Sequence, residues 1–160
     1  MGPHKPVGKG ETQEIKLEAA ASHIIEECRM VLPGIQALFG FQLIAVFNEG
    51  FGEKLSHPDQ LVHLLALVLT VLATVLVMTP AALQRHAEPR EVSERFVWLA
   101  SNLLLAAMYP LAVAVALDVY VVVGIVTRSD AVGAILAVVV FATFLVFWTF
   151  VPRREKRKYG

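Results

Sequence analysis

The sequence predicts an all-α, polytopic membrane protein with four transmembrane helices and an amphipathic N-terminal cytoplasmic helix. Two observations predict this class. Hydrophobic residues make up 56% of the chain and gather in four runs, each close to or above the roughly 20 residues that a helix needs to cross a bilayer. Lys and Arg gather almost entirely in alternate segments between those runs, which is the bias that orients membrane helices.

One transmembrane domain is expected over residues 11–151, between a disordered N-terminus at 1–10 and a basic tail at 152–160. Residues 11–30 place apolar side chains at helical spacing, with mostly acidic residues elsewhere on the helix. We expect this amphipathic helix to dock on the cytoplasmic face of the protein itself or on a neighbouring subunit. The four spans are expected at 31–49, 61–79, 96–126 and 131–151.

The first span begins where charged sequence meets apolar sequence. Glu27 and Arg29 belong to the charged side, and Pro33 and Gly34 follow within one turn or so. Because proline is tolerated in the first turn of a helix, this step predicts a hinge at the membrane interface. Gly40, further along the span, offers a small notch at which another helix can approach closely.

The third apolar run is too long for a helix perpendicular to the membrane. Thirty-one residues rise roughly 46 Å, against about 30 Å of hydrocarbon. A kink at Pro110 with a tilt places Asp118 near the outer headgroups, where it is solvated; at intramembrane depth the same carboxylate would mark a functional site. A second alternative ends the helix near Asp118 and leaves 119–126 extended, because that stretch is rich in β-branched residues.

The loop charges predict the orientation. With four spans, 12 of the 14 Lys and Arg residues fall on one side of the membrane. The positive-inside rule therefore places both termini in the cytoplasm. The basic tail serves as a stop-transfer signal and is also suited to anionic lipid headgroups. The residues concerned are Arg153, Arg154, Lys156, Arg157 and Lys158.

Polar side chains inside the spans are costly in lipid and are the places to look for function. His63, Thr70 and Thr74 form one narrow polar seam that either lines a pathway or serves helix packing. Asn102 and Asp118 point in nearly opposite directions on the third span. The full set of candidates for a pore or polar seam is Gln36, Gln42, Asn48, His63, Thr70, Thr74, Asn102 and Asp118.

The sequence lacks the residues that several functional classes of protein require. The single cysteine, Cys28, excludes an internal disulfide and any site built from several cysteines. The sequence contains no phosphate-binding, dinucleotide-binding, zinc-protease or hydrolase motif, so we expect no catalytic activity, no cofactor and no metal site. A net charge of zero gives no basic surface for nucleic acid.

The stretch that opens the first span resembles an uncharacterised family of small bacterial four-span membrane proteins, a domain of unknown function. That family opens its first span with Glu-x-Arg and continues L-x-G-x-Q-x-L-F-x-F-L. The similarity extends over residues 24–151 and includes Pro80 at the end of the second span. Two positions depart from the family's pattern. Gln42 stands where the family usually has an apolar residue, and residues 84–86 read "QRH" where the family has His-Arg. The resemblance implies a bacterial inner membrane location and no known activity. The matching residues are Glu27, Arg29, Leu32, Gly34, Gln36, Leu38, Phe39, Phe41 and Leu43.

Two function classes follow. The first is a homo-oligomeric channel or passive transport unit, which needs several copies because one chain of 160 residues can hardly enclose an aqueous path. The alternative is a non-catalytic accessory or scaffold subunit of a larger membrane complex. A channel requires its polar seams to face one continuous axis, whereas an accessory protein uses them up in helix packing.

Overall fold

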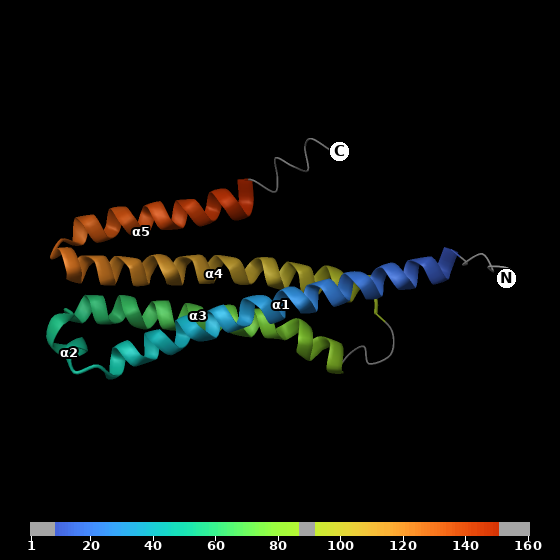
Figure 1. Cartoon of the computed structure of the whole chain (residues 1–160), viewed down its shortest axis with the longest axis horizontal. Helices are drawn as coiled ribbons and strands as arrows, with labels where there is room; N and C mark the ends of the chain where they lie inside the picture. Colours follow the sequence, from blue (N-terminus) through green and yellow to red (C-terminus); the bar gives the residue numbers. More distant parts are fainter. Residues whose placement is uncertain (1–8, 87–91, 151–160) are drawn as a thin grey trace, which may run out of the picture.

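The computed structural model describes residues 9–86 and 92–150, and within them the chain forms long helices that run roughly along one axis (Figure 1). No strand occurs in these residues, and four of their helices are long and apolar enough to span a membrane. The predicted all-α class with four membrane-spanning helices is confirmed. The elements are α1 (Lys9–Phe47), α2 (Gly50–Lys54), α3 (His57–His86), α4 (Glu94–Thr127), α5 (Asp130–Leu145) and a closing π-helical turn, η1 (Val146–Phe150).

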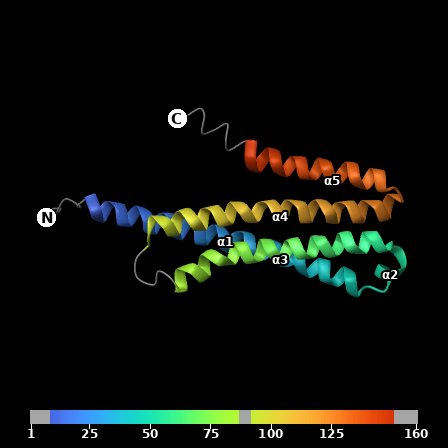
Figure 2. The ribbon, with the colours of Figure 1, turned by 180° about the vertical axis from the view of Figure 1, so that it is seen from behind.

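The long helices α3 and α4 form the centre of the molecule. Helix α1 packs against both of them, and α5 lies along α4 on the side away from α3 (Figures 1 and 2). Helix α2 and the turn between α4 and α5 lie together at one end, which we call the turn end. The beginning of α1, the end of α3 and the beginning of α4 lie at the other, which we call the terminal end.

Helix α1 is continuous where the sequence predicts a hinge. It runs for 39 residues with Pro33 inside it, so the amphipathic segment and the first apolar run belong to one helix. Both Pro33 and Gly34 are exposed, and a Cβ added at Gly34 would meet no atom within 4 Å. Proline in a helix interior removes one backbone hydrogen bond. The Pro33 ring lies on the exposed face of α1, and the helix continues on both sides of it.

The amphipathic half of α1 docks on the protein's own helices. Ala21, Ile24 and Cys28 are buried in a cluster with Phe96 and Ala100 of α4. The apolar core of the terminal end therefore extends beyond the first apolar run of the sequence.

Helices α3 and α4 meet along stripes of small residues. Helix α3 buries residues at alternating spacings of three and four, and four of the buried residues of α4 recur every seven residues. This spacing lets two helices stay in contact over a long distance, and small side chains let their backbones approach closely. The residues of these two stripes are His63, Ala66, Thr70, Ala73 and Val77 on α3, and Ala100, Ala107, Ala114 and Val121 on α4. Pro80 on α3 and Phe96, Ala112 and Ala116 on α4 are also buried.

Helix α4 is helical from end to end. It contains 34 residues, or roughly 51 Å, and both Pro110 and the stretch 119–126 lie inside it; the extended alternative for 119–126 is not seen. Ser93 caps its beginning by accepting a hydrogen bond from the backbone of Phe96 at 3.1 Å. Arg128 ends it with a left-handed φ of 52°.

Helix α5 packs against α4 through a close contact at Gly133. A Cβ on Gly133 would lie 2.7 Å from the backbone oxygen of Tyr120, so only glycine fits. Phe144 and Trp148 continue the same half-buried face, with ring centroids 4.6 Å apart. Most of the other residues of α5 are exposed in the isolated chain and are available to lipid or to another protein.

Candidate functional site

Three polar side chains from three different helices meet near the turn end. Gln42 lies five residues before the end of α1, His63 lies six residues into α3, and Asp118 lies nine residues before the end of α4. At 1.5 Å per residue they are roughly 8 to 14 Å inside the ends of their helices. We call Gln42, His63 and Asp118 the polar triad.

The triad is held by three contacts. The side-chain amide of Gln42 donates to Oδ2 of Asp118 at 2.7 Å. Nδ1 of His63 lies 3.3 Å from Oδ1 of the same carboxyl group. Nε2 of His63 lies 3.0 Å from the backbone oxygen of Gln42. Each residue therefore contacts both of the others, and α1, α3 and α4 are joined at one point.

The triad is enclosed. Gln42 is 3% exposed and His63 is 6% exposed, and the Asp118 side chain is 17% exposed. The ring of Phe51 on α2 packs edge-to-face on the His63 imidazole, with centroids 5.4 Å apart. Asp118 is thus mostly covered by protein, which differs from the solvated position expected at the outer headgroups.

The helix stripes explain why these residues meet. His63 is the first member of the buried stripe on α3. Asp118 lies between Ala114 and Val121, four residues after one and three before the other, on the buried stripe of α4. Gln42 is buried seven residues after Ile35, on the inward face of α1. Polar side chains at these positions have only one another as partners.

The contacts define where one proton must lie. The backbone oxygen of Gln42 can only accept a hydrogen bond, so Nε2 of His63 carries a hydrogen. In the neutral imidazole, a hydrogen on Nε2 leaves Nδ1 without one. Nδ1 then faces Oδ1 of Asp118 at 3.3 Å.

Two acceptor atoms of the triad are unsatisfied. The contact between Nδ1 and Oδ1 has the distance of an ion pair without the geometry of a hydrogen bond, so Oδ1 of Asp118 has no hydrogen-bond donor. Oε1 of Gln42 is also buried without a donor. An unpaired buried acceptor costs free energy.

The other polar candidates do not join the triad. Thr70 donates to the backbone oxygen of Ala66 at 3.0 Å, and Thr74 donates to that of Thr70 at 2.9 Å. Both threonines thus bond within α3.

Three amides stay outside the bundle interior. Asn102 is exposed and donates to the backbone oxygen of Trp98 at 2.9 Å. Asn48 is exposed and accepts from the backbone of Gly50 at 3.1 Å, at the start of α2. Gln36 is exposed on α1.

The residues around the expected hinge are distributed along the surface of α1. Glu27, Arg29, Pro33 and Gly34 are exposed. Gly40 is half-buried, and a Cβ added there would meet no atom within 4 Å. The notch at Gly40 is therefore not used by any helix within the described residues. The basic tail at 152–160 lies outside those residues, as do residues 1–8.

Sequence reasoning placed the three triad residues among the candidates without joining them. The sequence does contain the pattern that joins them: the seven-residue repeat of Ala100, Ala107, Ala114 and Val121 marks the inward stripe of α4. Asp118 falls on that stripe, and Asn102 does not. No group of three or more His, Cys, Asp or Glu residues that could hold a metal ion occurs in the described part of the chain.

The fold and the triad together define a helical membrane protein with four spans. A family model described as a family of unknown function (DUF6328) matches residues 10–152, and the chain belongs to this family. The predicted resemblance to an uncharacterised family is thereby confirmed, and the match begins in the amphipathic half of α1, before the expected residue 24. No curated protein and no solved structure matches the chain.

Proposed function

We propose that this protein is a non-catalytic accessory or scaffold subunit of a larger membrane complex. The proposal rests on the hydrogen bonds of the buried polar side chains, which are made within the bundle. The triad residues bond to one another, and the buried threonine of α3 bonds to its own helix.

A conducting pathway needs polar side chains that face a common open axis. The stripe of α3 that contains His63 and Thr70 also contains Ala66 and Ala73, both with no exposed surface. This stripe packs against α4, so it is closed to water. The homo-oligomeric channel expected first from the sequence would have to be built from other surfaces, and the exposed candidates Gln36, Asn48 and Asn102 are the ones left for it.

The apolar outer surfaces supply the area for partners. Helix α5 exposes Ile135 and Val138, η1 exposes Phe147, and α1 exposes Phe41 and Phe47. In a membrane such surfaces contact lipid or the helices of another protein. Self-association is one form of this contact, and the unused notch at Gly40 is a site at which a second helix could approach α1 closely.

The proposed location is the bacterial inner membrane, with both termini in the cytoplasm. The support for this orientation is the placement of 12 of the 14 basic residues in the segments at one side of the four spans. The terminal end of the bundle is then the cytoplasmic end. Protease added to the periplasmic side should leave residues 80–95 uncut, and cleavage there would refute the orientation.

Ion flux and native mass together test the function. The purified protein in liposomes should carry no flux of K⁺, Na⁺, Cl⁻ or H⁺ above that of empty liposomes. In native membranes it should run in a complex larger than any homo-oligomer seen with the purified protein. A flux that rises with protein amount and changes in a Gln36→Leu variant would overturn the proposal in favour of a channel.

A further inference from the structure

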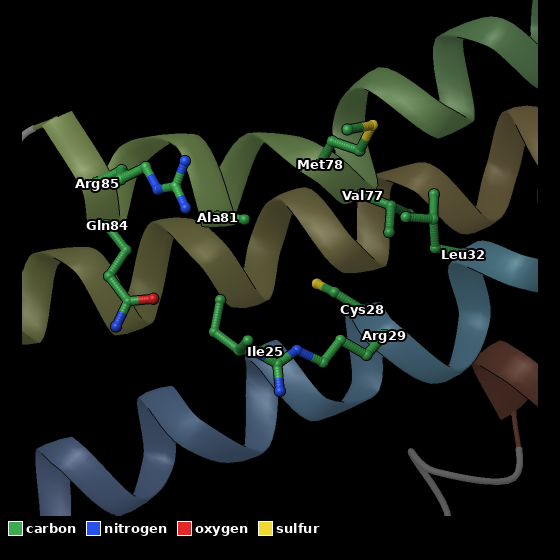
Figure 3. A pocket seen from close by; sticks show the side chains of 9 residues that line it. All are labelled: Ile25, Cys28, Arg29, Leu32, Val77, Met78, Ala81, Gln84 and Arg85. Atoms are coloured by element: carbon green, nitrogen blue, oxygen red, sulfur yellow. The ribbon is translucent and has the colours of Figure 1, made fainter.

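A cavity of about 520 Å³ lies between α1 and α3 at the terminal end (Figure 3). Arg85 and Gln84 extend from α3, and Arg29 extends along α1 toward Ile25. The end of the cavity away from Arg85 and Gln84 is mostly apolar (Figure 3). Its remaining lining residues are Cys28, Leu32, Val77, Met78 and Ala81.

The cavity exists because α3 turns away from α1 in its last turns. Pro80 lies inside α3, and a proline there removes a backbone hydrogen bond and bends the helix. Figure 1 shows α3 diverging from α1 toward the terminal end. The cavity-lining residues Val77 and Met78 precede this proline, whereas Ala81, Gln84 and Arg85 follow it.

The two guanidinium groups of the cavity have no acidic partner among residues 9–86 and 92–150. The nearby acids on α1 are directed elsewhere: Glu26 lies 3.7 Å from His23, and Glu27 lines a different cavity, between α1 and α4. The cavity is therefore positively charged at one end and apolar at the other.

Arg29 and Arg85 enter the cavity from different depths: Arg29 extends toward Ile25, and Arg85 extends toward Ala81 (Figure 3). Arg29 comes immediately before the apolar run of α1, 18 residues before Phe47, which is roughly 27 Å along the helix. Arg85 follows the apolar run of the antiparallel α3. A hydrocarbon core of about 30 Å that begins near the turn end would place both arginines at the opposite headgroup layer.

We propose that this cavity binds an anionic phospholipid. Arg29 and Arg85 hold the phosphate, because a guanidinium presents paired donors that match phosphate oxygens, and the Gln84 amide supplies a further donor. One acyl chain lies along Leu32 and Met78. Basic pockets between transmembrane helices suit anionic headgroups, and the apolar end of the cavity favours a lipid over a free phosphate ion.

This inference does not depend on the accessory or channel function. It adds a lipid ligand at the end of the bundle opposite to the polar triad. A lipid wedged between α1 and α3 would also stabilise the diverging ends of these helices.

Native mass spectrometry of the full-length protein tests the proposal. After reconstitution with equal amounts of phosphatidylglycerol and phosphatidylcholine, the wild type should retain phosphatidylglycerol selectively. An Arg29→Gln/Arg85→Gln variant should bind it more weakly by about tenfold for each arginine removed. Arg95→Gln, which removes an exposed arginine of α4 outside the cavity, is the matched control and should bind as the wild type does. Equal retention of both lipids, or an unchanged double variant, would overturn the proposal.

The single cysteine gives a second measurement, because Cys28 lines the cavity. Its reaction with the neutral reagent N-ethylmaleimide should be slower in phosphatidylglycerol nanodiscs than in phosphatidylcholine nanodiscs. The difference should vanish in the double variant. If inorganic phosphate or glycerol phosphate protects Cys28 as well as the lipid does, the occupant is a soluble anion and the proposal fails.

A second variant covers the case in which the double substitution prevents folding. Ala81→Leu narrows the cavity and leaves every charge in place. It should reduce phosphatidylglycerol retention, and retention equal to that of the wild type would count against the cavity as the binding site.

Discussion

The polar triad should contribute measurably to stability, and two identical substitutions on α1 isolate that contribution. Gln42→Leu removes the 2.7 Å bond to Asp118 and leaves the backbone oxygen that contacts His63 unchanged. Gln36→Leu makes the same chemical change at an exposed position six residues away. The pair therefore separates the amide bond from the general effect of replacing glutamine by leucine in an apolar helix.

The size of the effect follows from the partners. A hydrogen bond to a charged group contributes about 1.5–3 kcal/mol, although bonds between membrane helices average nearer 0.6 kcal/mol. The unpaired Oε1 of Gln42 is removed at the same time, which offsets part of the loss. We expect Gln42→Leu to lower the free energy of unfolding by about 1–2 kcal/mol. Gln36→Leu should change it by less than about 0.5 kcal/mol.

The assay is reversible unfolding in mixed micelles of dodecyl maltoside and sodium dodecyl sulfate, followed by circular dichroism. A double-mutant cycle with Asp118→Asn should give a coupling energy of about 1 kcal/mol or more between Gln42 and Asp118. Equal unfolding curves for the two leucine variants would refute the reasoning. So would a cycle in which the two effects simply add.

The same assay checks three further predictions. Gly133→Ala should lower the free energy of unfolding by about 1–2 kcal/mol, because the new Cβ would lie 2.7 Å from the backbone oxygen of Tyr120. Gly40→Ala, which has open space around it, should raise the free energy of unfolding by up to about 1 kcal/mol. Equal effects of the two substitutions would contradict the close contact at Gly133. Arg128→Gly should raise stability by about 0.5 kcal/mol, since φ is 52° there, and a loss would argue against a strained helix end. Ser93→Ala should cost about 1 kcal/mol through loss of the helix cap, whereas Ser93→Asp, which keeps an acceptor, should not.

The helices could be predicted because each depends on local sequence. Apolar runs of sufficient length predict membrane spans, and all four were found this way. The new helix start expected at Pro33 is not seen, because α1 continues through the proline at the loss of one backbone hydrogen bond. The extended alternative at 119–126 failed because β-branched residues form helix readily when backbone hydrogen bonds have no water to compete with them.

The triad could be predicted only in part. Gln42, His63 and Asp118 could each be recognised as costly in a span, and His63 and Asp118 could be placed toward the same side of the membrane. The sequence did not predict how each helix is rotated about its own axis, because that rotation depends on which buried stripes of the helices pack together. Gln42 in particular departs from the pattern of the family that the sequence resembles, and only the position of Asp118 on the facing stripe accounts for it.

The sequence by itself determined that this is a four-span helical membrane protein. It also identified the polar residues within the spans, which are costly to expose to lipid. Both properties follow from hydrophobicity along the chain, and hydrophobicity is local. The tertiary structure decided which polar residues are partners and where a cavity remains. Partnership requires helices distant in sequence to present specific faces at the same depth, and the cavity between Arg29 and Arg85 requires two helices to diverge. Those relations arise from packing, which no single segment contains.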